Sequence, residues 1–177
     1  MTGREIAIKP EAIVYTSNTG TTAQYAQLLG QATGLPVHAL AQAGEALAPG
    51  SRILYLGWLM AGQVKGYKKA AKRYAVCAVC GVGMGVTGSQ LEDVRRTNAV
   101  PAQTPVFTLQ GGYDRARLHG VYKLMMTIME KAAGKGLPGK ENRTPEEDAM
   151  LDMLRHGGNR VSETNLSAVL GWYRGEA

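Results

Sequence analysis

The sequence predicts an α/β fold, namely a doubly wound sheet of five parallel strands in the order 2-1-3-4-5 with helices on both faces. Two observations support this prediction. Short apolar runs alternate along the chain with stretches whose apolar residues recur at helical spacing. Strands that alternate with helices form a mostly parallel sheet covered on both sides. In such a sheet, ligands bind at the carboxyl ends of the strands, beside the point where the strand order reverses.

The five candidate strands are short runs of aliphatic and aromatic residues, and each is bounded by polar residues or by residues typical of turns. They span residues 12–15, 37–40, 53–56, 74–82 and 106–109. The fourth run carries both cysteines, Cys77 and Cys80. Residues three apart on a strand point to opposite faces, so the two sulfur atoms should diverge. We therefore expect two core cysteines rather than a local redox disulfide.

The candidate helices occupy the intervals between the strands. The first spans residues 21–33 and ends at Gly34, two residues before Pro36. The others span residues 64–73, 89–96, 118–133, 144–155 and 164–172. Residues 118–133 show the clearest helical spacing, and a Thr-Pro-Glu-Glu start at Thr144 is typical of a capping box. Residues 135–143 are rich in Gly and Lys and predict a loop.

The composition indicates one globular domain over residues 1–177, with a less typical helical extension over residues 134–177. Hydrophobic residues make up 45% of the 177 residues and charged residues 19%. No apolar run approaches the roughly 18 residues of a membrane span, and the amino terminus lacks the apolar segment of a signal peptide. We therefore expect a cytoplasmic protein. A peripheral membrane contact stays open.

The net charge of +6 favours anionic partners, although solubility alone also explains it. Five of the basic residues gather in the second candidate helix: Lys65, Lys68, Lys69, Lys72 and Arg73. We interpret them as a solvated outer face. No exposed aromatics are interleaved among them for base stacking, so we expect no nucleic-acid partner. The histidines are scattered without metal-ligand spacing, so we expect no metal site.

The loop after the first strand is the candidate ligand-binding segment. It consists of Thr16, Ser17, Asn18, Thr19, Gly20, Thr21 and Thr22, and we call it the hydroxyl loop. It contains no charged residue, and it opens a helix whose free N–H groups and positive dipole end suit a phosphate. A Walker A loop needs a lysine and a receiver domain needs acidic residues here, so both are excluded. The alternative is a Ser/Thr-rich helix cap with no ligand.

At these residues the chain resembles the flavodoxin family. The family's phosphate loop has the form [ST]-x-T-G-[NT]-T, and residues 17–22 match it at each position. The resemblance implies an FMN cofactor whose 5′-phosphate lies among Thr16 to Thr22.

The topology then places two further flavin-binding segments. One follows the third strand and consists of Gly57, Trp58, Leu59, Met60, Ala61 and Gly62. Trp58 is a candidate to lie against the flavin ring, and a core tryptophan is the alternative. The other follows the fourth strand and consists of Gly83, Met84, Gly85, Val86 and Thr87; we call it the glycine loop. Together with Gly88 it matches a dinucleotide fingerprint, but it follows the wrong strand and no acidic residue follows for a ribose.

A narrower resemblance covers the second half of the chain. Residues 108–114, with Leu118 and residues 122–126, are similar to the flavodoxin-domain branch related to the menaquinone-dependent protoporphyrinogen oxidase. With the hydroxyl loop, this resemblance spans most of residues 10–133, and it implies a flavin oxidoreductase. Tyr113 and Asp114 would border a substrate entrance or form an ordinary turn and helix cap.

The sequence therefore leads to three hypotheses about function. The first is an FMN-dependent oxidoreductase that acts on a quinone, a porphyrinogen or a similar ring. The second is an electron carrier that docks a redox partner protein, although carrier flavodoxins are typically acidic. The third is a non-catalytic binding module whose hydroxyl loop holds another phosphorylated ligand or none. No catalytic residue follows from the pattern, and the electron donor, the acceptor and the oligomeric state are not determined by it.

Overall fold

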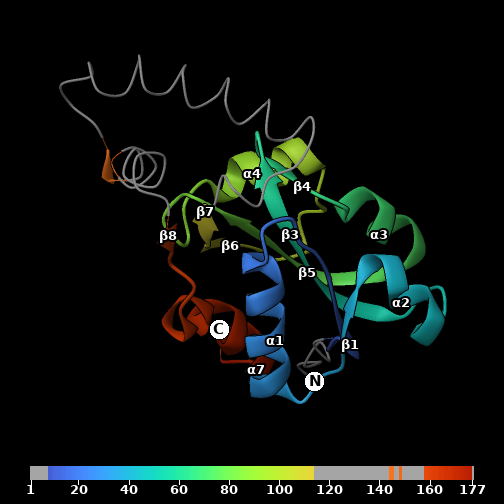
Figure 1. Cartoon of the computed structure of the whole chain (residues 1–177). Helices are drawn as coiled ribbons and strands as arrows, with labels where there is room; N and C mark the ends of the chain where they lie inside the picture. The colour runs from blue at the N-terminus through green and yellow to red at the C-terminus, as the bar shows by residue number, and fades with distance from the viewer. Residues whose placement is uncertain (1–7, 114–143, 146–147, 149–157, 177) are drawn as a thin grey trace, which may run out of the picture.

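The computed structural model describes residues 8–113, 144–145, 148 and 158–176. Its main sheet contains five parallel strands in the order β2-β1-β3-β5-β6 (Figure 1). They are β1 Ala12–Thr16, β2 Val37–Ala39, β3 Arg52–Met60, β5 Ala75–Gly83 and β6 Val106–Gln110. Counting parallel strands only, this order is the predicted 2-1-3-4-5. The flavodoxin-like, doubly wound fold is confirmed.

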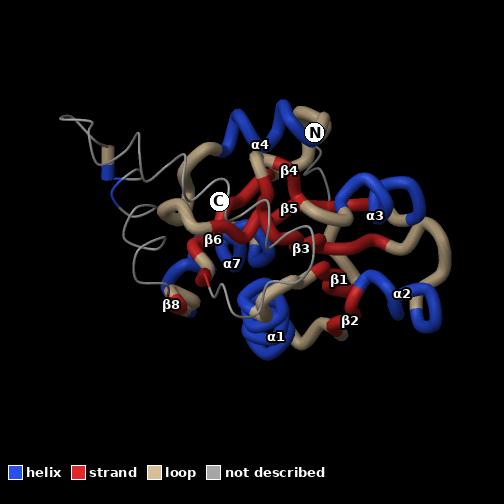
Figure 2. The backbone as a smooth tube through the Cα atoms, turned by 45° about the horizontal axis from the view of Figure 1, so that its top comes forward, coloured by secondary structure: helices blue, strands red, loops and turns tan. Residues whose placement is uncertain are grey.

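Helices cover both faces of this sheet (Figure 2). On one face lie α1 Thr21–Thr33 and α7 Ser167–Arg174; on the other lie α2 Leu40–Ala46, α3 Tyr67–Arg73 and α4 Leu91–Asn98. Strand β3 supplies both cores, because successive side chains alternate between faces. Leu54 and Leu56 pack toward α1, whereas Ile53 and Tyr55 pack toward α3. All four side chains are fully buried, which explains why the run is apolar throughout.

Strand β3 is longer than predicted, and the predicted loop from Gly57 to Gly62 is wrong over its first four residues. The strand runs to Met60, turns at Ala61 and Gly62, and pairs in antiparallel fashion with β4 Gln63–Val64. Gly57 does not end the strand. A Cβ there would lie 2.4 Å from the carbonyl oxygen of Lys65, so glycine is needed for the close approach of the returning chain.

Helix α1 has its predicted bounds, whereas α3 and α4 start later than predicted. Helix α3 begins at Tyr67 rather than at Val64, because Gly66 has a φ of +80° and caps the helix in the left-handed region. Helix α4 begins at Leu91 rather than at Ser89. The seven-residue α2 was not predicted, and it shortens the second strand by one residue.

The carboxyl-terminal part of the described chain packs beside β6 and α1. A second small sheet pairs β7 Gly112–Tyr113 with β8 Gly158–Asn159, and neither strand was predicted. The predicted last helix is a 3₁₀ turn, η2 Glu163–Leu166, followed by α7. Asn165 donates to the Tyr25 hydroxyl over 2.8 Å, and Tyr25 donates to the Gln110 carbonyl. These bonds join η2 and the end of β6 to α1.

Two predicted segments, residues 118–133 and the loop 135–143, lie outside the described residues. Of the helix predicted for residues 144–155, the described part is helical at Pro145 and Asp148, and the Asp148 N–H donates to the Thr144 carbonyl over 3.0 Å. Within the described part of the chain, no helix combines the length and apolarity that crossing a bilayer requires.

The cysteines form no disulfide. Cys80 is fully buried, as predicted, and burial raises the pKa of its thiol. Cys77 is only half-buried, because the pairing of β3 with β5 shifts between Ile53 and Leu54 and leaves Cys77 as the extra residue of a bulge.

Candidate ligand site

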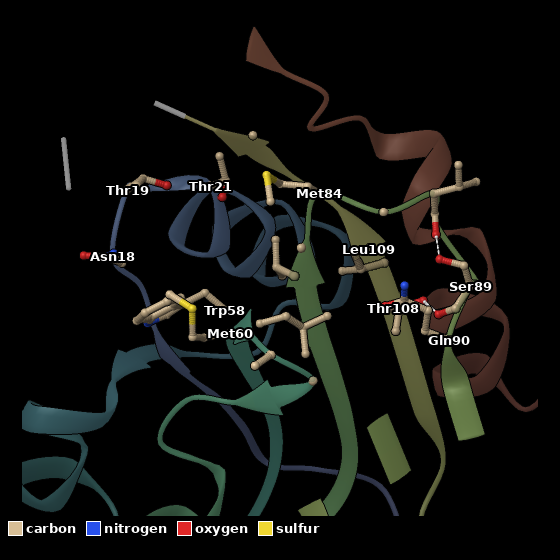
Figure 3. A pocket seen from close by; sticks show the side chains of 18 residues that line it. Asn18, Thr19, Thr21, Trp58, Met60, Met84, Ser89, Gln90, Thr108 and Leu109 are labelled. Carbon is tan, nitrogen blue, oxygen red and sulfur yellow. Dashed lines mark hydrogen bonds between the residues drawn. The ribbon is translucent and has the colours of Figure 1, made fainter. Parts of the chain in front are cut away.

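A cavity of about 310 Å³ opens at the carboxyl edge of the sheet (Figure 3). It lies where the chain order reverses between β1 and β3, which is where doubly wound folds bind ligands. Its walls come from the hydroxyl loop, the β3–β4 hairpin, the glycine loop and the end of β6. No ionisable side chain belongs to the described residues that line it.

The structure brings the three predicted segments together around this cavity. The predicted residues that line it are Asn18, Thr19, Thr21, Trp58, Leu59, Met60, Ala61, Gly62, Gly83, Met84, Gly85 and Val86. The other residues of the three segments do not line it: Thr16, Ser17, Gly20, Thr22, Gly57 and Thr87. Some residues of the hydroxyl loop therefore line this cavity, and others adjoin them in the chain without lining it.

The hydroxyl groups of Ser17 and Thr16 form hydrogen bonds within the protein. The Ser17 hydroxyl accepts a hydrogen bond from the Gly20 N–H over 3.1 Å and closes the turn. The Thr16 hydroxyl lies 2.7 Å from the Tyr55 hydroxyl, which donates its own hydrogen to the Lys65 carbonyl over 2.6 Å. Because a tyrosine has one hydrogen to give, Thr16 is the donor in the first of these bonds.

Tyr55 joins the hydroxyl loop to the segment that follows β4. The side chain is fully buried, and this burial raises the pKa of Tyr55 to about 12. The joint is tight: a Cβ on Gly66 would lie 2.2 Å from the Tyr55 hydroxyl and 2.5 Å from the Thr16 hydroxyl. Residues 16, 55 and 66 therefore form one packed unit behind the loop.

Two buried polar atoms of the loop have no partner among the described residues. The side-chain amide nitrogen of Asn18 and the hydroxyl of Thr22 are both buried and unbonded. Burying such a group without a partner costs about 1–3 kcal/mol. No side chain caps α1, whose cap residue Gly20 has a φ of +101°, and its first turn holds no acidic residue. These donors at a helix amino terminus fit the oxygen atoms of an anion.

Trp58 lies at the junction of the loop and the hairpin. Thr16 pairs with Gly57 across β1 and β3, so the hydroxyl loop leaves the sheet beside Trp58. The tryptophan is half-buried and lines the cavity together with Met60, the next residue on the same strand face (Figure 3). One further contact was not predicted: the Lys65 ammonium lies 5.7 Å from the centroid of the Trp58 ring.

The glycine loop forms the opposite wall and is bonded to β6. The Gln110 N–H donates to the Thr87 hydroxyl over 2.9 Å, and the Gln110 side chain donates to the Met84 carbonyl over 3.2 Å. A Cβ on Gly83 would lie 3.1 Å from the Leu59 side chain, so the glycine leaves room for this residue of the neighbouring strand β3. The backbone of this wall is therefore held in place by protein contacts.

Sequence reasoning missed part of the lining. The missed residues are Val82, Ser89, Gln90, Thr108, Leu109 and Gly112. A signal for Thr108, Leu109 and Gly112 was present, since the rule about carboxyl ends of strands applies to the last strand as well. Of the proposed substrate entrance, Tyr113 belongs to β7, and Asp114 lies outside the described residues.

The basic residues separate into two groups. Lys68, Lys69, Lys72 and Arg73 are exposed on α3, as predicted for a solvated face. Lys65 is half-buried and lies before the helix. Among the described residues, no group of His, Cys, Asp and Glu side chains could hold a metal ion.

No protein-family model, curated protein or solved structure matches this chain. The site itself must therefore support any statement about function.

Proposed function

We propose that this protein binds FMN and transfers electrons between the flavin and a quinone, a porphyrinogen or a similar ring compound. The observation that carries the proposal is the hydroxyl loop. It leaves buried donors of Asn18 and Thr22 unbonded beside the uncapped start of α1, at the edge of a cavity. The 5′-phosphate of FMN would satisfy donors of this kind without a charged residue in the loop.

The rest of the cavity suits the other end of such a cofactor. Ligand pockets span about 300–1,000 Å³ and are mostly apolar, and the volume of about 310 Å³ fits the lower end of that range. Trp58, Met60 and Met84 would hold the flavin ring by apolar and aromatic contact. The bound flavin would supply the electron chemistry, while these residues orient it and exclude water.

A second candidate is an electron carrier without a small-molecule substrate. The absence of ionisable side chains from the described cavity lining favours it, since none of these residues could act as a general acid or base on a substrate. The exposed lysines of α3 differ from the acidic surface typical of carrier flavodoxins.

The visible spectrum of the purified protein tests the proposal. We expect a flavin band at about 450 nm, either as purified or after FMN is added and the excess removed. A colourless protein that takes up no added FMN contradicts both candidates. Stopped-flow oxidation of the reduced protein by menadione then separates them: rapid, saturable oxidation indicates an oxidoreductase, and slow, unsaturable oxidation indicates a carrier.

A further inference from the structure

Lys65 lies 43 positions after Thr22, the last residue of the uncharged hydroxyl loop. The fold nevertheless connects its backbone to the start of that loop. Its backbone is fixed at both ends: the Lys65 N–H donates to the Trp58 carbonyl over 3.0 Å, and its carbonyl accepts from Tyr55 over 2.6 Å. Tyr55 in turn holds Thr16, the first residue of the loop. The position of the Lys65 backbone relative to the loop is therefore set by hydrogen bonds through Trp58 and Tyr55.

The side chain of Lys65 extends over the ring of Trp58, at the margin of the cavity that Trp58 lines. Its ammonium lies 5.7 Å from the centroid of the Trp58 ring, and Trp58 lines the cavity together with Asn18 and Thr19. Figure 3 shows Trp58 below the part of the loop that bears these two residues. Lys65 as a residue is half-buried, whereas the lysines of α3 are exposed, and salt screens partly buried charges less than exposed ones.

We propose that Lys65 is the counter-ion of the ligand's phosphate and supplies the positive charge that the hydroxyl loop lacks. This inference rests on the proposed function, because it assumes a phosphorylated flavin in the cavity. Near neutral pH a phosphate monoester carries a charge close to −2, whereas the loop offers only neutral donors and a helix dipole. One ammonium held beside the loop would compensate part of that charge and would select FMN over riboflavin, which has no phosphate.

The test compares FMN with riboflavin, using flavin fluorescence quenching to measure the dissociation constant of each. Lys65→Met keeps the apolar stem over Trp58 and removes the charge. Lys68→Met is the matched control, because it removes one exposed charge from the first turn of α3. Lys65→Arg restores the charge.

We expect Lys65→Met to weaken FMN binding by about 10-fold, or about 1.4 kcal/mol, and to change riboflavin binding by less than about 2-fold. Lys68→Met should change both by less than about 2-fold, and Lys65→Arg should bind FMN nearly as the unchanged protein does. Added salt should weaken FMN binding more in the unchanged protein than in Lys65→Met. Retained riboflavin binding reports that the variant is folded.

Two results would overturn the inference while leaving the proposed function intact. In the first, Lys65→Met binds FMN as tightly as Lys68→Met does. In the second, it loses FMN and riboflavin affinity equally, which would mean that the substitution weakens the contact between Trp58 and the flavin ring rather than phosphate binding. If the unchanged protein binds neither flavin, the proposed function itself fails, and the inference fails with it.

Discussion

The two walls of the cavity use their polar groups in opposite ways. In the hydroxyl loop, the side-chain amide nitrogen of Asn18 and the hydroxyl of Thr22 have no partner among the described residues, and no side chain caps the helix that follows. In the glycine loop, Thr87 and the Met84 carbonyl are both bonded to Gln110 of β6. The first wall therefore has buried donors without a partner among the described residues, whereas polar groups of the second wall are bonded within the protein. Substitutions in the two walls should consequently act differently on binding and on stability.

The largest effect is expected at the glycine that supports the hydroxyl loop. Gly66 and Gly88 share nearly the same backbone conformation, with φ of +80° and +84°. A Cβ at Gly66 would lie 2.2 Å from the Tyr55 hydroxyl, whereas nothing lies within 4 Å of one at Gly88. Gly66→Ala should lower the free energy of unfolding by about 4 kcal/mol, from strain and overpacking together, and Gly88→Ala by about 1 kcal/mol, from strain alone.

Urea unfolding of both variants measures this difference. Equal losses of stability would mean that the packed unit of residues 16, 55 and 66 does not support the loop.

The next effect concerns Tyr55 and alkaline pH. Its pKa rises from 10.0 in a free side chain to about 12 in the fold. The unfolded chain therefore loses this proton first, and the stability due to Tyr55 is fully present below about pH 10 and is lost as pH rises toward 12. A shift of this size corresponds to about 2–3 kcal/mol. Tyr55→Phe should therefore lose less stability than the unchanged protein between pH 9 and pH 11.5.

Burial also raises the pKa of Tyr25, Tyr67, Cys77 and Cys80, so Tyr55→Phe retains part of the alkaline loss. The difference between the two proteins isolates Tyr55. Identical pH profiles of the urea midpoint would show that the Tyr55 hydroxyl ionises as freely in the fold as outside it.

The smallest effects are expected from two threonines, one in each wall. Thr22→Val removes a buried hydroxyl that has no partner, so the ligand-free protein should gain up to about 1 kcal/mol of stability while FMN binding weakens by about 5-fold. Thr87→Val removes the acceptor of the Gln110 N–H, so stability should fall by about 1–2 kcal/mol with FMN affinity nearly unchanged.

Thermal unfolding without flavin and fluorescence titration with FMN test this pair. If Thr22→Val destabilises the ligand-free protein and leaves FMN affinity intact, its hydroxyl serves the fold rather than a ligand.

The end of β3 and the start of α3 are two boundaries that the sequence alone did not predict. Glycine commonly ends a strand or a helix, so the sequence predicts that the third strand ends at Gly57. In the structure it lies inside β3, because the chain returns at Lys65 and leaves no room for a Cβ. Gly66 instead starts α3. Which glycine marks a boundary depends on the neighbour that approaches it, and a single sequence does not contain that neighbour's position.

The hydroxyl loop was predictable for the opposite reason. Its residues are consecutive, they follow an apolar strand, and they open a helix with clear spacing. Periodicity and helix-start chemistry act between near neighbours in the chain. The same reasoning predicted the strand order and the meeting of the three segments at one edge, since parallel strands place their carboxyl ends together.

The sequence by itself determined the doubly wound sheet and an uncharged, hydroxyl-rich loop at the start of α1. Only the tertiary structure decided which of its polar groups stay unbonded, that Tyr55 joins Thr16 to Lys65, and that an ammonium lies against Trp58. The physical reason is distance along the chain. Local patterns follow from backbone geometry over a few residues, whereas contacts among residues 16, 55 and 65 exist only once strand register has brought them together.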